Sequence, residues 1–452
     1  MPGKSREQGH MTDMTRGDSL KMIVRFAIPL VGAAMLQQMF SLTDAMVLGI
    51  YSGDRGLAVL GVCTWPVWFQ VSALTNFGQA SCLLTAVRFG AKNEKSLQKA
   101  IGNVYGVSVW IGILMVLILQ GGAQWLLTIQ NTPEEIFADA LGYLRIIFLG
   151  TIFLLIYNML SSLLRAAGDS YTSFVAIVVS VIANIFLDIL FVGGLGWGVA
   201  GAAGATTLSQ AVSALICLVR IRSYPVFRVG IKRWKLDPGL MREYGGLCVP
   251  MMAQSAVIAF GGTYVQSQIN QYGTIFAAGV SAAGKIFSLV ETGATSLAAA
   301  SASFVSQNVG AKQFDRIEKA VRQVCLLALA LAAGTAALLL LFGDRMMGLY
   351  ATKEAMIYGM GNLRVYSFGL LIMYPMYSLR QVIQALGNLK IPLLAAILQL
   401  VMRVITARFL PVLMGCAGIY YATPAAWAVT LILIGAMYPV QLKRCRQNMA
   451  GR

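Results

Sequence analysis

The sequence predicts an all-α integral membrane protein with twelve transmembrane helices, arranged as two parallel six-helix repeats. Two observations carry this prediction. The chain of 452 residues is 58% hydrophobic and only 12% charged, whereas a soluble protein carries about 25% charged residues. Its two halves also resemble each other, because motifs of the first half recur in the same order in the second. Most of this chain is therefore expected to be surrounded by lipid.

The internal repeat is clearest in a polar loop. The sequence GAKNEKSLQKAI begins at Gly90, and GAKQFDRIEKAV begins 220 residues later at Gly310. At nearly the same spacing GYLRIIFLG, from Gly142, recurs as GNLRVYSFG from Gly361. LLRAAGD likewise recurs as VIQALGN, and AIPL as CVPM. Such a duplication is common in secondary transporters, whose substrate sites lie where the two halves meet.

Twelve apolar runs are candidates for membrane spans, and most have about the 20 residues that cross a hydrocarbon core. They begin near residues 22, 57, 99, 134, 171, 199, 244, 276, 317, 355, 391 and 416. Six spans are an even number, so the second half starts on the same side of the membrane as the first. The two repeats are therefore expected to be parallel, related by an axis along the membrane normal.

The loops and apolar runs divide the chain into five segments. We predict a disordered cytoplasmic tail at 1–20, an N-lobe six-helix bundle at 21–219, a basic cytoplasmic linker at 220–242, a C-lobe six-helix bundle at 243–442 and a cytoplasmic tail at 443–452. The linker contains prolines and aromatic residues, which favours an element on the lipid surface that tethers the lobes without locking them. The other loops are too short for a soluble domain, and the sequence has no phosphate-binding GxxxxGK[ST] loop, which argues against an ATP-driven pump.

Basic residues decide the orientation. They gather at the N-terminus, in the loop around Lys92, between Arg220 and Arg242, in the loop around Lys312 and at the C-terminus. All these segments fall on one side, so the positive-inside rule predicts a multi-pass protein of the cytoplasmic (inner) membrane with both termini in the cytoplasm. We interpret Arg380, near the tenth loop, as a further determinant of topology. Orientation and attraction to anionic lipid account for the net charge of +17, so we expect no nucleic-acid partner.

Two acidic residues inside predicted spans are the strongest functional candidates. Asp44 lies toward the outer end of the first span, and Asp188 lies toward the outer end of the fifth. A charge at this depth costs roughly 3 kcal/mol or more. Helical spacing places Gln37 on the face of Asp44 and Asn184 on the face of Asp188, and Thr206 lies in the sixth span. These oxygens could bind a proton or a sodium ion; alternatively, the two acids are paired with buried donors or lie at a wet interface.

The second half has a different set of polar residues. Lys285 and Glu291 lie in the eighth span but are six positions apart, so they point in different directions on one helix. Glu291 either faces a cavity and attracts cations or pairs with a basic group of another helix, and the sequence leaves both open. Pro29 and Pro250 occupy equivalent positions in the two halves. Each could be a functional bend or a static kink.

These features resemble the multidrug and toxic compound extrusion (MATE) family over roughly residues 20–442. The resemblance is most specific in IPLVGAAMLQQMFSLTDAMVLG, in the FGAKN loop, and in LLRAAGDSYTSFVAIVVSVIANIFLDILFVGGLGWGVAGAAGATTLSQ. It implies two six-helix lobes around a central cleft and a protein that exports organic cations and drugs by antiport against H⁺ or Na⁺. The implied ligands are small organic cations, with membrane lipid around a monomer and no cofactor beyond the coupling ion.

The resemblance also implies roles for individual residues. The N-lobe cation site resembles Asp44, Asn184, Asp188 and Thr206 of this chain, with Na⁺ at Asp44 and Asp188 as one possibility. Gln37, Tyr143, Asn158 and Glu291 are the expected substrate-cavity residues, and Pro29 is the expected hinge. The chain departs from family members that carry a glutamate in the seventh span and an aspartate in the tenth, because VPMMAQSAVIAFGG and SFGLLIMYPMYSLRQ contain neither. Coupling through a C-lobe carboxylate pair is therefore not expected.

Two other classes of protein compete with this prediction. A lipid-linked precursor flippase of the same superfamily would need a cavity rich in cationic residues, whereas the first lobe offers acids. An intramembrane enzyme would need a nucleophile with a base, or carboxylates at metal spacing. The sequence has no intramembrane histidine and no HExxH pattern, and its seven cysteines show no paired spacing. We therefore expect a transporter and not an enzyme.

Overall fold

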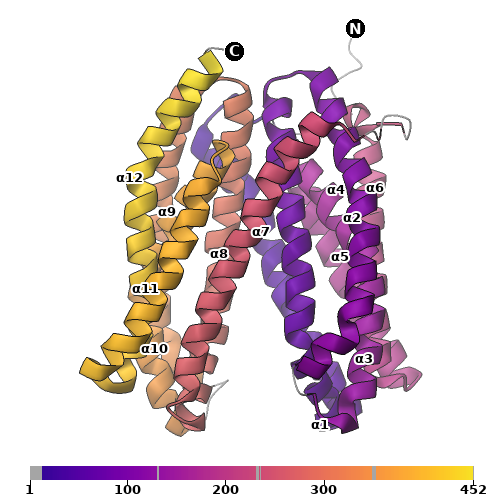
Figure 1. Cartoon of the computed structure of the whole chain (residues 1–452), viewed down its shortest axis with the longest axis vertical. Coiled ribbons are helices and arrows are strands. Elements are labelled where there is room, and N and C mark those ends of the chain that lie inside the picture. The colour runs from indigo at the N-terminus through magenta and orange to yellow at the C-terminus, as the bar shows by residue number, and fades with distance from the viewer. Residues whose placement is uncertain (1–12, 130–131, 231–233, 235, 349–352, 451–452) are drawn as a thin grey trace. The chain divides into compact units, whose positions relative to one another are not determined.

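The computed structural model describes residues 13–129, 132–230, 234, 236–348 and 353–450. All regular structure in these ranges is helical (Figure 1). The first half contains α1 (Ser19–Gly90), α2 (Glu94–Ile129), α3 (Glu134–Leu149), α4 (Thr151–Ala166), α5 (Tyr171–Asp188), η1 (Ile189–Gly194), α6 (Gly198–Arg222) and η2 (Pro225–Phe227). The second half contains α7 (Pro238–Asn270), α8 (Thr274–Gly310), α9 (Phe314–Met347), α10 (Lys353–Ala385), α11 (Lys390–Met414), η4 (Gly415–Tyr421) and α12 (Ala422–Ala450).

The helices agree with the predicted spans. Helix α1 has 72 residues and contains the first two spans, while α3 and α4 together form the fourth. Within the described ranges, nine helices are long and apolar enough to cross a membrane, or ten when the bent pair at the end of α1 counts as one span. One of these stretches, Lys390–Met449, contains both α11 and α12. When α11 and α12 are counted separately and α10, which is less apolar, is added, these ten stretches give twelve spans. The predicted fold class is therefore confirmed.

The helices form two compact units. The N-lobe unit contains Ile28–Cys248, and the C-lobe unit contains Met14–Ala27 and Val249–Arg452. The predicted bundles therefore exchange short segments: the start of α1 belongs to the C-lobe unit, and the start of α7 belongs to the N-lobe unit. Each helix changes unit next to an interior proline, Pro29 in α1 and Pro250 in α7.

The segment before α1 differs from the predicted tail. Residues 1–12 of that tail lie outside the described residues, but the rest is ordered. The side chain of Met14 is fully buried, and its N–H donates to Oε1 of Gln307 at 3.0 Å. Arg316 donates to the carbonyl oxygen of Gly17 at 2.5 Å, and α1 begins at Ser19. Side chains of α8 and α9 thus form hydrogen bonds with backbone groups of the segment before α1. The polar composition of this segment does not reveal these contacts.

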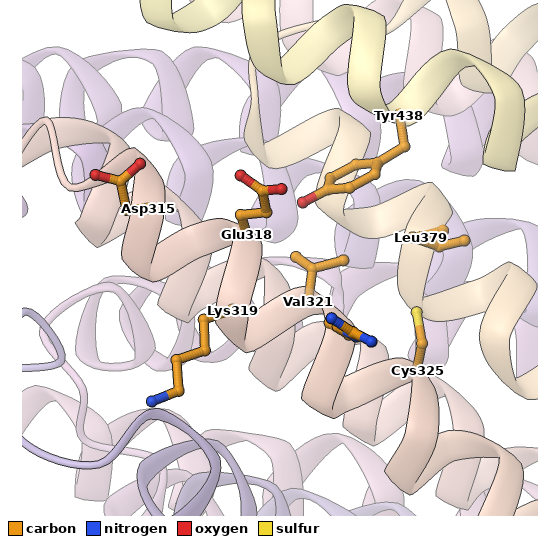
Figure 2. Close-up of a pocket in the computed structure, with 8 residues that line it drawn as sticks. Asp315, Glu318, Lys319, Val321, Cys325, Leu379 and Tyr438 are labelled. Atoms are coloured by element: carbon orange, nitrogen blue, oxygen red, sulfur yellow. The ribbon is translucent and has the colours of Figure 1, made fainter.

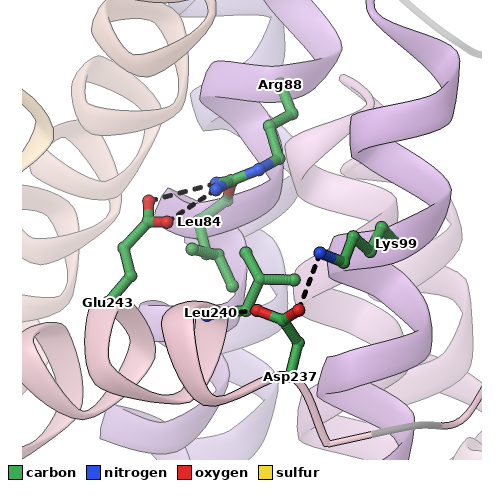
Figure 3. A network of polar contacts seen from close by, with 6 residues as sticks. All are labelled: Leu84, Arg88, Lys99, Asp237, Leu240 and Glu243. Atoms are coloured by element: carbon green, nitrogen blue, oxygen red, sulfur yellow. Dashed lines mark hydrogen bonds and ion pairs between the residues drawn. The ribbon is translucent and has the colours of Figure 1, made fainter.

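The end of the basic linker is fixed on the N-lobe unit (Figure 3). Arg88, at the end of the long α1, donates to both carboxylate oxygens of Glu243 at 3.2 and 2.6 Å. Lys99 of α2 forms a 2.7 Å ion pair with Asp237. Asp237 also accepts the N–H of Leu240 at 3.0 Å and so caps α7. The linker therefore holds α7 at its start, where we expected only a loose tether.

Asp237 gives a testable dependence on pH. The hydrogen bond from Lys99, and then the N–H of Leu240, hold the pKa of this carboxyl below its usual value of 3.8. Because the folded pKa is the lower one, the pair stabilises the fold above about pH 4, and this contribution disappears as the pH falls through the folded pKa. Asp237→Asn keeps a capping oxygen but removes the charge. The wild type should melt above this variant at about pH 7, and the difference should shrink as the pH falls below about 4; a constant difference in thermal unfolding would contradict this.

The repeat in the sequence is also a repeat in the backbone. Lys92 and Lys312, equivalent residues of the two GAK loops, both adopt positive φ angles, 54° and 58°. Among the described residues they are the only non-glycine residues that do so, and this conformation is uncommon without glycine. Gly168 and Gly387 form a second equivalent pair, with φ angles of 86° and 84°. The two halves therefore make the same turns at the same places.

Candidate functional site

The structure brings the predicted N-lobe residues together inside one unit. Asp44 lies on α1, Asp188 is the last residue of α5, and Thr206 lies on α6. The hydroxyl of Thr206 donates to Oδ2 of Asp44 at 3.2 Å. Asp44 is 9% exposed, and both Asp188 and Asn184 are fully buried. Residues separated by up to 162 positions in the chain thus form one buried polar cluster.

Most polar atoms of this cluster lack a hydrogen bond of normal geometry. Asp44 and Asp188 lie close enough to interact electrostatically, with Asn184 beside them. Oδ1 of Asp44, both oxygens of Asp188 and both amide atoms of Asn184 are nevertheless buried without a hydrogen bond. Two ionised carboxylates side by side repel each other, and unsatisfied buried polar atoms cost free energy. A proton or a small cation between the two acids would relieve both costs.

A local distortion of the backbone positions Asp188. Helix α5 ends at this residue and continues as the wider π-helical turn η1, a feature that is frequent at functional sites. Gly193 in this turn lies under the ring of Tyr51, because a Cβ atom at Gly193 would lie 2.9 Å from a ring carbon. A side chain at this position would therefore displace the ring of Tyr51 on α1. The sequence analysis missed this element, and the glycine pair after the apolar run LDILFV was its only signal.

Of the other predicted N-lobe residues, Tyr143 interacts electrostatically with both acids, whereas the described hydrogen bonds connect neither Gln37 nor Asn158 to them. Tyr143 of α3 is buried in an apolar group that includes Val47 of α1. Gln37 is exposed on α1. Asn158 of α4 is half-buried, and its amide donates to the carbonyl oxygen of Leu154 within its own helix at 2.9 Å. Their role as substrate-cavity residues stays a prediction, as does the role of Pro29 as a hinge.

Glu291 lies in the C-lobe unit and has basic neighbours. It is half-buried on α8, and the hydroxyl of Tyr377 on α10 donates to it at 2.5 Å. Arg380 and Arg403 interact with its carboxylate electrostatically. Of the two interpretations that the sequence left open, these contacts favour an interaction with basic groups of other helices. Lys285 lies six positions earlier on α8 and is exposed.

A bound sodium ion would need ligands beyond the two acids. In the described ranges, no three or more His, Cys, Asp or Glu side chains come close enough to hold a metal ion. Na⁺ at Asp44 and Asp188 would therefore use the oxygens of Asn184 and Thr206 as well, and such hard oxygen ligands suit this ion. The residues present thus fit either a proton or Na⁺.

A cavity of about 590 Å³ lies elsewhere, in the C-lobe unit (Figure 2). It is formed by α9, α10 and α12, and its lining residues are Asp315, Glu318, Lys319, Val321, Arg322, Cys325, Leu379 and Tyr438. Its charged residues are close to the start of α9, and two of them carry each sign. This cavity contains none of the predicted site residues, so it is separate from the N-lobe cluster.

Comparison with known proteins supports a single family. The family profile described as MatE matches residues 29–190 and again residues 250–408. The two matches correspond to the two halves of the chain. Each begins at or next to an interior proline, Pro29 or Pro250.

Individual relatives match over nearly the full length. The chain is 27% identical over 435 residues to the probable multidrug resistance protein YoeA of Bacillus subtilis (strain 168), covering 93% of each chain. It is 23% identical over 434 residues to the multidrug export protein MepA of Staphylococcus aureus (strain NCTC 8325 / PS 47), covering 94% of each. A crystal structure of MATE in the bent conformation matches with a TM-score of 0.91 and 20% identity, over 99% of this chain and 100% of that one. At this identity the solved structure supports the fold alone.

Proposed function

Because the chain belongs to the MatE family, whose profile matches both of its halves, we propose that it is a secondary active antiporter. It exports organic cations and drugs across the cytoplasmic membrane in exchange for H⁺ or Na⁺. Relatives named as multidrug resistance and multidrug export proteins support this proposal. The chain is a multi-pass membrane protein of a transporter family, and this proposal requires no catalytic residue.

The observation that carries the proposal is the buried acid pair of the N-lobe unit. An external cation or proton enters the unit and binds between Asp44 and Asp188, where it satisfies atoms that otherwise lack partners. The bound positive charge cancels the attraction of the two carboxylates for a cationic substrate. The substrate then binds more weakly and leaves on the outer side. In the next step the coupling ion is released inward.

The chemistry of this unit also separates the proposal from its nearest rival. A flippase for a lipid-linked precursor carries an anionic head group, which buried carboxylates would repel. Asp44 and Asp188 instead attract cations, and Thr206 and Asn184 add neutral oxygen ligands. The predicted orientation, with both termini in the cytoplasm, places the two acids toward the outer half of the membrane. An ion driven inward by its gradient would reach them first.

Efflux from proteoliposomes tests the proposal. The purified chain is reconstituted, a fluorescent organic cation is enclosed, and an inward Na⁺ gradient or an inward H⁺ gradient is imposed separately. Efflux that is faster under one gradient than without it establishes antiport and identifies the coupling ion. No acceleration under either gradient, with protein shown to be folded by its thermal unfolding, would contradict the proposal.

A further inference from the structure

The cavity between α9, α10 and α12 has a counterpart in the N-lobe unit. The internal repeat relates residues 90–101 to residues 310–321, so Lys319 in the cavity corresponds to Lys99 of α2. At the same spacing Cys325, which also lines the cavity, corresponds to Tyr105. The two places therefore lie on equivalent helices, but they differ in what covers them.

In the N-lobe unit the end of the basic linker covers this place. Asp237 pairs with Lys99 at 2.7 Å (Figure 3), and the ring centre of Trp234 lies 5.2 Å from that of Tyr105. The linker backbone approaches α2 closely, because a Cβ atom at Gly106 would lie 3.0 Å from the carbonyl oxygen of Trp234. The linker thus supplies a negative charge for the lysine and an apolar body beside it.

In the C-lobe unit the equivalent place is a cavity of about 590 Å³. Helix α12, the counterpart of α6, stays helical to Ala450, and no segment of the described chain covers α9 as the linker covers α2. None of the ion pairs among the described residues includes Lys319. Leu326, at the position of Gly106, is 62% exposed. The described C-lobe residues thus supply neither an anion paired with this lysine nor an apolar cover.

The charged residues of the cavity specify a ligand further. Asp315 pairs with Arg446 of α12, whereas the ion pairs of the described chain include neither Glu318 nor Arg322. The hydroxyl of Tyr438 is buried without a hydrogen bond and interacts electrostatically with Glu318, and Figure 2 shows these two side chains next to each other. With the lysine, the cavity presents two positive charges and one negative charge. A group that carries charges of both signs would match them.

The position of the cavity favours a membrane lipid. Its charged residues lie close to the start of α9, which the predicted orientation places at the cytoplasmic surface of the membrane. Basic pockets between membrane helices at this surface bind lipid head groups. Val321 and Leu379 add apolar surface to the cavity, and Leu326 and Leu329 are exposed further along α9. Apolar surface next to a charged pocket suits a head group with attached acyl chains.

We propose that this cavity binds the head group of a phospholipid with a primary ammonium group, as in phosphatidylethanolamine. The phosphate binds Lys319 and Arg322, and the ammonium group donates to Glu318 and to the hydroxyl oxygen of Tyr438. The acyl chains occupy the place that Trp234 fills in the other half. A choline head group carries the same charges but has no N–H to donate, so the site distinguishes the two lipids. This binding does not depend on the proposed export function.

Competition between two lipids tests the site. Phosphatidylethanolamine and phosphatidylcholine with the same acyl chains are added at equal concentration to the purified full-length chain, and native mass spectrometry measures how much of each is bound. The ethanolamine lipid should bind about three- to fivefold more tightly, the size of one ion pair at a surface. Equal binding would overturn the proposal. Soluble phosphoethanolamine at the same concentration should leave the lipid bound; complete displacement would show a site for a soluble phosphate ester instead.

Single substitutions separate the two parts of the head group. Glu318→Gln should remove the preference for the ethanolamine lipid and leave the affinity for the choline lipid unchanged. Arg322→Gln should weaken both lipids about threefold, because both carry the same phosphate. Glu354→Gln alters an exposed acid at the start of α10 and should change neither affinity. A preference that survives in Glu318→Gln would refute the role of this acid and with it the site.

A variant that fills the cavity provides an independent test. Cys325→Trp places an indole where the ring of Trp234 lies in the other half, and it leaves every charge intact. Binding of both lipids should fall several-fold, whereas unchanged binding in a variant with the wild-type melting temperature would overturn the site. No ion gradient enters these measurements, so either result leaves the proposed export function as it stands.

Discussion

Replacement of Asp188 by asparagine is expected to abolish ion-driven export while the protein still folds. Asp188 is fully buried, and neither of its oxygens has a hydrogen-bond partner. The amide has nearly the same shape but cannot take up a proton or neutralise a cation. Gradient-driven efflux of a fluorescent organic cation should therefore fall at least tenfold, toward the rate of empty liposomes. Asp44→Asn should behave in the same way, because the two acids bind the ion together.

A surface acid provides the matched control for this experiment. Asp139 belongs to the same unit, but its side chain is 39% exposed and forms an ion pair with Arg55 at 2.8 Å. Asp139→Asn should export at the wild-type rate, and expression and melting temperature should be similar for all three variants. Normal ion-driven export by well-folded Asp188→Asn would refute the assignment of the coupling site.

Replacement of Asp169 by alanine is expected to cause the largest loss of stability. Asp169 precedes α5 and is 1% exposed. Its carboxylate accepts the N–H and the hydroxyl of Thr172 at 2.9 and 2.7 Å and the hydroxyl of Tyr224 at 2.8 Å, with Nε of Arg220 at 3.6 Å. The substitution removes a helix cap and leaves buried donors unpaired, which costs roughly 2–4 kcal/mol. The melting temperature of the detergent-purified protein measures this loss.

The repeat supplies the control for this variant as well. Asn388 occupies the equivalent position before α11, where it caps the N–H of Ile391 at 3.2 Å and donates to Gln441 at 2.8 Å. Its amide carries no charge, so Asn388→Ala should lower the melting temperature less than Asp169→Ala. The loss of melting temperature in Asp169→Asn should lie between those of Asn388→Ala and Asp169→Ala, because asparagine keeps the capping oxygen. A melting temperature unchanged by Asp169→Ala would show that the hydrogen bonds around Asp169 do not hold the start of α5 to the end of α6.

The overall fold could be predicted because duplication and lipid exposure both leave strong signals in a sequence. The shift between Gly90 and Gly310 indicated two equivalent halves, and the shared left-handed conformation of Lys92 and Lys312 confirms this. Helix α10 carries several charges and is less apolar than the other spans. Its apolar run, which begins near residue 355, still identified it in the sequence as a span.

The candidate sites were predictable to different degrees. A carboxylate inside an apolar run is conspicuous, so Asp44 and Asp188 could be selected directly, although their side-by-side position required the fold. The basic neighbours of Glu291 in the C-lobe unit were not identified, because Arg380 was attributed to topology and Arg403 was not selected. Helical spacing relates residues of one helix only, and these residues come from three. The exchange of Met14–Ala27 into the C-lobe unit was missed for the same reason.

The most direct test of the central claim measures linkage between the coupling ion and the substrate. The affinity of the purified chain for a fluorescent organic cation is determined with and without the coupling ion, or at two pH values if that ion is H⁺. The account predicts that the ion weakens substrate binding in the wild type by about tenfold or more, a usual size for coupling between sites, and has no effect in Asp188→Asn. An equal effect in Asp188→Asn, or none in the wild type, would contradict the account.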